Sequence, residues 1–122
     1  MNRVGVDVIL RAEGVATCAA GIGLWLANGG PAWLLIPAWL LVDLSMIGYL
    51  GGPLLGSITY NAAHNLVLPV VLIGLGWWSG TGWLLLGGAV FVTHVGLDRA
   101  LGYGLKLPTD FRDTHLGRIG KA

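Results

Sequence analysis

The sequence has very little charge, and most of its charged residues lie near the two ends. Only 11% of the 122 residues are Asp, Glu, Lys or Arg, whereas about 25% is usual in soluble domains. Between Glu13 and Asp98 the one formally charged residue is Asp43. A formal net charge of +1 also gives no basic surface for nucleic acid. The composition therefore argues against an ordinary soluble domain and against nucleic-acid binding.

Cysteine is almost absent. Cys18 is the only one, which excludes an intrachain disulfide and a zinc site built from cysteine pairs. Alternation of apolar and polar residues with a period of two is missing as well, so the strands of a membrane barrel are not expected. The sequence is instead 55% apolar, with 21 glycines and six tryptophans. Small residues that let helices approach closely, and tryptophans at the headgroup boundary, are typical of integral membrane proteins.

Four apolar segments, separated by short joints rich in glycine and proline, predict an all-α four-helix transmembrane bundle. Each has close to the ~20 residues that an α-helix needs to cross about 30 Å of hydrocarbon. Pro37 and Pro69 lie inside the second and third segments, where each is expected to kink its helix. The expected spans form a domain over residues 1–101, at about 8–27, 32–50, 57–78 and 83–101, followed by a polar cytoplasmic tail at 102–122.

The basic residues predict the orientation of the bundle. They lie before the first segment and from the end of the fourth onward, while the three joints carry no charge. By the positive-inside rule, both the N- and C-termini are expected in the cytoplasm. Tryptophans near the two opposite joints fit an outer aromatic belt, namely Trp25, Trp33, Trp77, Trp78 and Trp83.

The ionisable side chains of the apolar segments are expected to share one layer near the cytoplasmic face. In this topology Asp43, His64 and His94 each lie about seven residues from a cytoplasmic helix end, or ~10 Å deep at 1.5 Å per residue. His94 and Asp98 are four residues apart, so they project from the same helix face. Glu13, on the first helix, is slightly shallower. An ionisable group in hydrocarbon costs several kcal/mol unless it is paired or faces a polar cavity. This layer is therefore the candidate site.

Two imidazoles with two or three carboxylates inside a helix bundle form the ligand set of a divalent transition metal. We predict that Asp43, His64, His94 and Asp98, together with Glu13, bind zinc, iron or manganese, and that the first four are catalytic. A bound metal would offset the burial of the carboxylates and activate a water for hydrolysis. Sharing one ion requires the two histidines to lie within about 12 Å of each other. Further polar neighbours are expected at Ser45, Tyr49, Tyr60 and Asn61.

Three other interpretations of these residues stay open. In a structural network, interhelical hydrogen bonds worth ~0.6–2 kcal/mol each hold the bundle together. Asp43 then pairs with a protonated histidine, and Asp98 pairs with Arg99 or Arg11. The layer could also serve proton or ion translocation. Haem ligation by the two histidines is disfavoured, because the neighbouring aspartates suit a harder cation.

The tail has two interpretations as well. It begins directly beneath the polar layer, so it could close the cytoplasmic mouth of the site, with Lys106, Arg112 and Arg118 meeting lipid phosphates. It could equally be a solvated segment whose basic residues only fix the orientation.

Four motifs are distinctive in combination: Asp43-Leu-Ser-Met-Ile-Gly-Tyr, Tyr60-Asn-Ala-Ala-His64, His94-Val-Gly-Leu-Asp98-Arg-Ala-Leu-Gly-Tyr-Gly-Leu-Lys106 and Asp113-Thr-His-Leu-Gly-Arg-Ile-Gly. Together they resemble a family of small bacterial membrane proteins described only as domain of unknown function 4260. The resemblance runs from about Arg11 to Gly120. It implies a multi-pass protein of the bacterial cytoplasmic (inner) membrane, and it implies no activity.

The leading functional prediction is a metal-dependent hydrolase or transferase that takes a lipid or polyprenyl-type substrate from the cytoplasmic leaflet. The alternative is a non-catalytic membrane component whose His/Asp network is structural or binds a partner. Whether the protein is an enzyme depends on which of the two holds. Beyond the lipid bilayer, the expected partner is a second copy of the chain, because glycine-rich faces favour close packing. These faces are Gly21-Ile-Gly23, Gly74-Leu-Gly76 and Gly87-Gly88.

Overall fold

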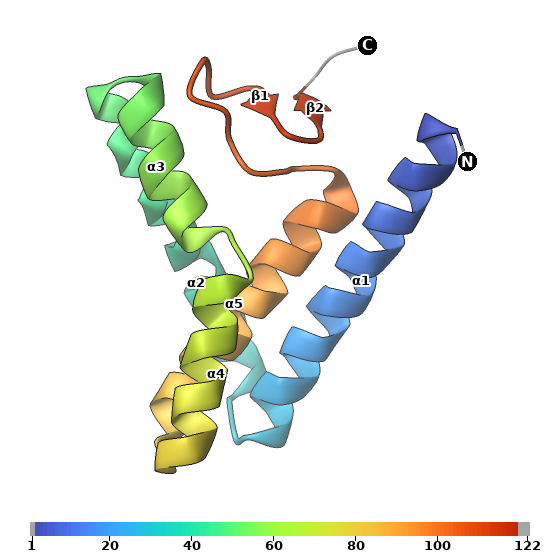
Figure 1. Cartoon of the computed structure of the whole chain (residues 1–122). Coiled ribbons are helices and arrows are strands. Elements are labelled where there is room, and N and C mark those ends of the chain that lie inside the picture. The colour runs from blue at the N-terminus through green and yellow to red at the C-terminus, as the bar shows by residue number, and fades with distance from the viewer. Residues whose placement is uncertain (1, 120–122) are drawn as a thin grey trace.

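The computed structural model describes residues 2–119, which form four long helices and a short C-terminal hairpin (Figure 1). Met1 and residues 120–122, the end of the expected tail, lie outside this part. The first span is α1, Arg3–Ala27; the second is α2, Ala32–Leu41, continued by the 3₁₀ helix η1, Val42–Gly51; the third is α3, Pro53–Ala63, followed by α4, Val67–Ser79; the fourth is α5, Gly82–Leu101.

All four helical spans are long and apolar enough to cross a membrane. Their outer surfaces carry large apolar side chains, such as Ile47 and Leu50, which are 70% and 88% exposed. A molecule with this much exposed apolar surface would aggregate in water, whereas in a bilayer the same surface contacts lipid. The predicted fold class, an all-α four-helix transmembrane bundle, is confirmed, and the chain is a multi-pass membrane protein.

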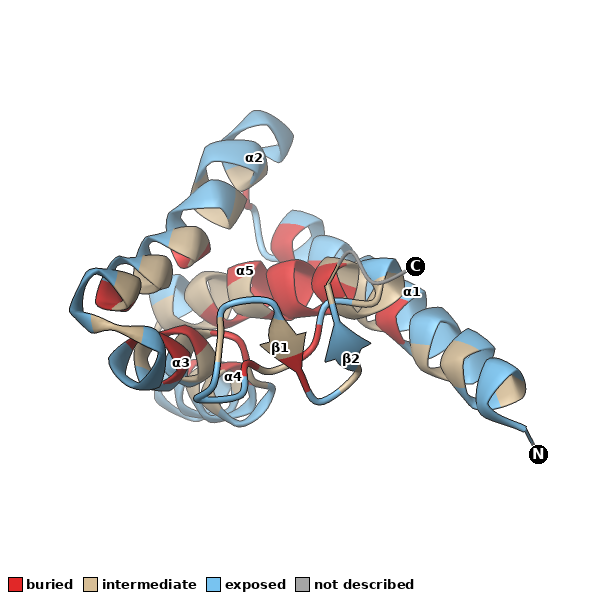
Figure 2. Ribbon diagram, turned by 90° about the horizontal axis from the view of Figure 1, so that it is seen from above, coloured by how far each residue is buried: buried red, intermediate tan, exposed pale blue. Residues whose placement is uncertain are grey.

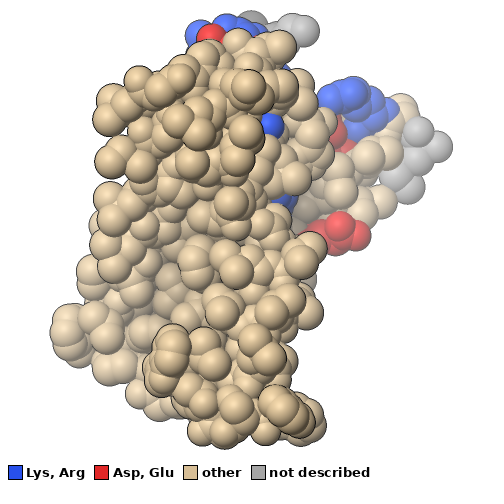
Figure 3. Space-filling view, turned by 60° about the vertical axis from the view of Figure 1, so that its left-hand side comes forward, with Lys and Arg blue, Asp and Glu red and all other residues tan. Residues whose placement is uncertain are grey.

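Charged side chains and both chain ends gather at one end of the bundle. Figure 1 shows the N- and C-terminal ends at the top, and Figure 3 shows Lys, Arg, Asp and Glu in the upper part of the face drawn. At the opposite end Trp77 and Trp78 are 79% and 81% exposed. Trp25 is only 5% exposed, and its indole N–H donates to the carbonyl of Pro31 at 2.8 Å. It therefore stabilises the joint between the first two spans and is not part of the predicted outer belt.

Helix α5 is the centre of the molecule (Figure 2). It packs along α1 through glycines, so that the two backbones come into contact. A Cβ atom on Gly14 would lie 2.8 Å from the carbonyl oxygen of Gly96. Such contacts between small residues are a common means of helix association in lipid. Helix α1 thus holds one face of α5, and the other faces remain for α2, α4 and the candidate site.

The third span is interrupted at residues 64–66, where a continuous helix was predicted. The Asn65 side chain bridges the gap. Its Nδ2 donates to the carbonyls of Asn61 and Ala62 at 2.8 and 2.9 Å, and its Oδ1 accepts from the N–H of Leu68 at 2.9 Å. An unsatisfied backbone group in lipid costs several kcal/mol. The amide therefore makes the break possible by serving both helix ends.

The two prolines lie near changes of backbone rather than at simple kinks. Pro69 is the third residue of α4, just after the break, and α2 continues past Pro37 before the helix tightens into η1. In a 3₁₀ helix, residues three apart lie on the same side. Asp43, Met46 and Tyr49 thus share one side of η1, which faces the candidate site and the tail.

The tail returns to the bundle instead of extending from it. Gly102, with φ of 89°, turns the chain away from the end of α5. Strands β1, Asp113–Thr114, and β2, Gly117–Arg118, then form an antiparallel hairpin. Asn61 of α3 binds the tail backbone twice: the N–H of Lys106 donates to Asn61 Oδ1 at 2.7 Å, and Asn61 Nδ2 donates to the Lys106 carbonyl at 2.8 Å.

Candidate metal centre

Two histidines and two aspartates converge where η1, α3 and α5 meet. The Nε2 atoms of His64 and His94 lie 3.1 Å apart. Asp43 Oδ1 is 3.3 Å from the first and 3.2 Å from the second, while Asp98 Oδ2 is 3.7 and 3.4 Å from them. Both imidazoles are fully buried, and the Asp43 side chain is 34% exposed. The predicted convergence of these four side chains is therefore present, with the histidines well inside the limit for sharing one ion.

Main-chain carbonyls orient both imidazole rings. His64 Nδ1 lies 2.8 Å from the carbonyl oxygen of Tyr60, and His94 Nδ1 lies 2.7 Å from that of Trp39. Because a carbonyl only accepts hydrogen bonds, each Nδ1 carries a proton. The Nε2 atom of a neutral ring then presents its lone pair to the other ring and to the carboxylates. Four acceptors that meet in this way require a positive charge between them, from a metal ion or from a proton.

The spacing of three ligand atoms, Asp43 Oδ1 and the Nε2 atoms of the two histidines, fits a tetrahedral metal ion. Bonds of ~2.0–2.1 Å from zinc to nitrogen or oxygen place tetrahedral ligand atoms about 3.4 Å from one another. The separations among the three atoms run from 3.1 to 3.3 Å. Asp43, His64 and His94 form a group whose ligand atoms all lie within 4.8 Å of one another. These three side chains could hold an ion, with Asp98 beside it.

Aromatic rings support the centre from two sides. The Tyr60 ring stacks on His64 with centroids 3.6 Å apart and planes at 6°, and its hydroxyl donates to Asp98 Oδ2 at 3.4 Å. The Trp39 ring stacks on His94 at 4.4 Å. Tyr60 thus fixes one imidazole through its ring and one carboxylate through its hydroxyl.

Glu13, predicted as a further ligand, lies elsewhere. It is exposed on α1 and lines a separate cavity of about 310 Å³ together with Arg99 and His115. Helix α1 packs against the Gly96 face of α5, whereas His94 and Asp98 project from another face. The depth of Glu13 along α1 does not bring it to the cluster, because depth does not specify the helix face from which a side chain projects.

The other predicted polar neighbours divide into two groups. Ser45 Oγ lies 3.3 Å from His64 Nδ1, and Tyr60 contacts Asp98 as described. The Tyr49 hydroxyl is buried without a hydrogen-bond partner among residues 2–119. Asn61 binds the tail rather than the cluster.

Arg99 has a role that the sequence analysis missed. Its guanidinium donates to the carbonyl of His64 at 3.1 Å and to that of Tyr103 at 2.9 Å. Within the described chain these carbonyls replace the ion pair expected with Asp98. Arg99 therefore joins the helix break beside the site to the start of the tail.

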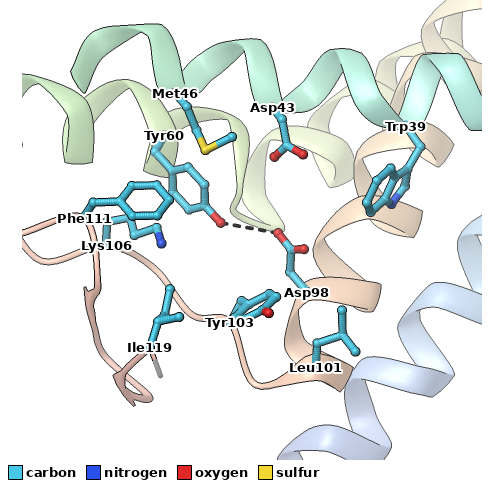
Figure 4. Close-up of a pocket in the computed structure, with 10 residues that line it drawn as sticks. All are labelled: Trp39, Asp43, Met46, Tyr60, Asp98, Leu101, Tyr103, Lys106, Phe111 and Ile119. Atoms are coloured by element: carbon cyan, nitrogen blue, oxygen red, sulfur yellow. Dashed lines mark hydrogen bonds between the residues drawn. The ribbon is translucent and has the colours of Figure 1, made fainter. Parts of the chain in front are cut away.

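A cavity of about 320 Å³ opens beside the two aspartates (Figure 4). Its walls come from α2, η1, α3, α5 and the tail, so the interpretation of the tail as a cover over the site is the one that agrees with the structure. Five lining side chains are mainly apolar: Trp39, Met46, Leu101, Phe111 and Ile119. The polar ones are Asp43, Tyr60, Asp98, Tyr103 and Lys106.

Lys106 was predicted to contact lipid phosphates, but it does not lie at the lipid surface. It is only 4% exposed, and burial lowers the pKa of its ammonium group despite the opposing effect of Asp98 and Asp43. The distance between the two histidines also excludes a haem that both of them bind. Two axial imidazoles stand on opposite faces of a porphyrin, whereas here their Nε2 atoms lie 3.1 Å apart.

Comparison with known protein families places most of the chain in one family. The model of a family described as a domain of unknown function, DUF4260, matches residues 7–119, which include all four residues of the cluster. No curated protein and no solved structure matches the chain.

Proposed function

Because the chain belongs to the DUF4260 family, a domain of unknown function, its function has to be inferred from the site, and we propose a metal-dependent hydrolase or transferase that acts on a lipid-like substrate. The observation that carries this proposal is the convergence of two imidazole nitrogens and the Asp43 carboxylate at the spacing of metal ligands, with the Asp98 carboxylate beside them. A divalent ion supplies the positive charge that this arrangement requires, and zinc, iron and manganese are the candidates.

The side chains take different roles in this proposal. Asp43, His64 and His94 would hold the ion. The ion would supply a water that is a nucleophile near neutral pH. Asp98, held by the Tyr60 hydroxyl and next to the ion, accepts the proton of the water.

The substrate is proposed from the surroundings of the site. Half of the side chains that line the cavity are apolar, and the cavity lies between membrane-spanning helices and the tail, which supports entry of an acyl or polyprenyl chain from the bilayer. We place the charged end of the bundle in the cytoplasm by the positive-inside rule. The substrate would then come from the cytoplasmic leaflet of a bacterial inner membrane.

Metal analysis tests the proposal directly. We expect protein purified without chelator to contain about one zinc, iron or manganese ion per chain, and His94→Ala to contain almost none. Chelated protein should lose hydrolysis of ester- or phosphoester-linked lipids and regain it when the ion is returned. Arg3→Ala, an exposed substitution at the charged end, is the matched control. Protein without metal after supply of all three ions at neutral pH would refute the proposal.

The competing function is a non-catalytic membrane component, in which a proton replaces the ion. The same contacts favour it, because each imidazole lies within ion-pairing distance of Asp43 and Asp98. The cluster then holds helices together or binds a partner. In that case His64→Ala lowers the stability of the bundle and changes neither metal content nor any turnover.

A further inference from the structure

Lys106 places a buried positive charge in the wall of the cavity. The residue is 4% exposed, and its Nζ lies 3.9 Å from the ring centroid of Phe111 and 4.9 Å from that of Tyr60. Among residues 2–119 the ammonium group makes no hydrogen bond and no ion pair. Figure 4 shows it directed into the space that Tyr60, Asp98 and Tyr103 enclose.

Specific contacts fix the position of Lys106. Both main-chain groups of Lys106 are held by the Asn61 side chain, and the residue also forms a bridge with Thr114 of β1. A lysine in a mostly buried position without an anionic partner is costly. Contacts with aromatic rings offset only part of that cost. An anion that enters the cavity would supply the missing partner.

The charges around the cavity show when an anion would be attracted. Asp43 and Asp98 carry two negative charges, which a divalent ion with neutral imidazoles would cancel. Lys106 then leaves the loaded site with a net positive charge. Without the ion, a proton held in the cluster leaves one negative charge, which Lys106 only balances, so the site has no net positive charge to attract an anion. Binding of an anion should therefore depend on the metal.

We propose that the cavity binds the phosphate group of an amphiphile, with Lys106 as its ammonium partner and the metal centre on its other side. This inference rests on the metal site of the proposed function. A phosphate has several oxygens and can contact an ion and an ammonium group at once, and lysine binds it as a point charge. The apolar chain lies against Trp39, Met46 and Phe111.

The Tyr60 ring links the ammonium group to the metal centre. Its centroid lies 4.9 Å from Lys106 Nζ and 3.6 Å from the centroid of the His64 imidazole. Lys106, Asp43 and Asp98 line one cavity of about 320 Å³, so an anion in that cavity faces both positive groups.

The experiment uses dodecyl phosphate as the probe and full-length protein in a maltoside detergent, with metal content measured on the same sample. Calorimetry should detect binding to the metal-loaded protein and much weaker binding after chelation. Lys106→Met keeps the length and burial of the side chain but removes its charge. It should weaken binding by roughly ten- to a hundred-fold, as expected for a lost charge-assisted contact. Lys106→Arg and the exposed control Arg3→Met should keep it.

Each outcome decides between alternatives. Equal affinity in wild type and Lys106→Met overturns the role of the lysine. Metal-loaded wild type that binds no dodecyl phosphate overturns the inference and leaves the metal proposal intact, whereas absence of metal refutes both. Inorganic phosphate that binds as tightly as dodecyl phosphate would identify a free anion as the ligand and overturn the amphiphile. Should Lys106→Met not fold, wild type still has to prefer dodecyl phosphate over dodecyltrimethylammonium.

Discussion

Asp43 and Asp98 lie in the same cluster but differ in exposure and contacts. The Asp43 side chain is 34% exposed toward the cavity, and the Asp98 side chain is 10% exposed and bonded to Tyr60. We expect Asp43→Asn to lose the metal, because an amide is a weaker ligand for a transition metal. Asp98→Asn should keep the metal but lower turnover by roughly 10²–10⁴-fold, since the amide cannot accept the proton of the water. Metal content and rate, measured on the same samples, separate the two. Loss of metal in Asp98→Asn would make Asp98 a ligand instead.

His115 makes the position of the tail dependent on pH. Its Nδ1 accepts from the N–H of Leu105 at 2.8 Å, which only an unprotonated Nδ1 can do. Burial lowers the pKa of His115, and the charge of Arg99 lowers it further. As the pH falls, His115 is therefore protonated in the undocked tail before it is protonated in the docked tail. Docking is fully stable above the ordinary histidine pKa of about 6.5 and weakens as the pH falls below it.

Hydrogen exchange of residues 103–119, followed from pH 8 to pH 5, measures this effect. We expect exchange, after correction for its intrinsic pH dependence, to increase below pH ~6.5. His115→Asn offers a carbonyl oxygen in place of Nδ1 and does not titrate, so its exchange should not respond to pH. An equal response in both proteins would show that another group controls the tail.

At the scale of the elements, the break between α3 and α4 depends on one amide. Asn65→Leu keeps the size of the side chain but removes three hydrogen bonds at the two helix ends. We expect a loss of about 1–3 kcal/mol in the free energy of unfolding, as is usual when buried backbone groups lose their partners. Thermal unfolding in detergent measures it. Ser79→Ala, which removes only exposed hydrogen bonds, should change stability by less than about 0.5 kcal/mol.

Much of the architecture can be predicted from the sequence, and the reasons are physical. Hydropathy and short joints specify four spans, because the bilayer tolerates few other ways to cross it. Counting residues from the helix ends then brings Asp43, His64 and His94 to one depth, and Asp98 follows on the same helix face as His94. Glu13 lies at a similar depth, but α1 packs against a different face of α5. Glycine contacts between the two helices determine that face, and the local sequence does not show them.

The features that cannot be predicted are those in which a side chain forms the hydrogen bonds that main-chain groups would form in a regular helix. Asn65 and Arg99 satisfy the ends of a broken helix, so the local sequence still resembles a continuous span. The burial of Lys106 depends on Asn61, which is 45 residues away in the chain. A lysine in a polar tail carries no local signal of such a partner.

At the scale of the whole molecule, the position of both chain ends beside the charged end predicts their location. We expect reporter fusions after Ala122 and within joint 28–31 to report opposite sides of the membrane, with Ala122 in the cytoplasm. Joint 28–31 lies at the other end of the bundle in Figure 1. Two cytoplasmic reports would contradict the topology, and with it the access of substrate from the inner leaflet.

A homodimer is our expectation for the assembly. In each of the three glycine pairs, one member packs inside the chain: Gly21, Gly76 and Gly88. Around an added Cβ of Gly23, Gly74 and Gly87, the described residues leave open space. The outward glycines leave a smooth surface that a second copy can approach closely. Light scattering of the detergent complex should give a protein mass near two chains. A single-chain mass at all concentrations would count against the dimer.

The carbonyl anchors of the two imidazoles have a consequence for how the family can diverge. Every residue type offers a main-chain carbonyl, so Tyr60 and Trp39 can be exchanged without loss of the hydrogen bonds that orient His64 and His94. A substitution at either position would keep the hydrogen bond to the imidazole but lose the ring that stacks on it, and at Tyr60 also the contact with Asp98. We expect both histidines to stay fixed in distant members, and any change at Tyr60 or Trp39 to retain a ring that can stack on them.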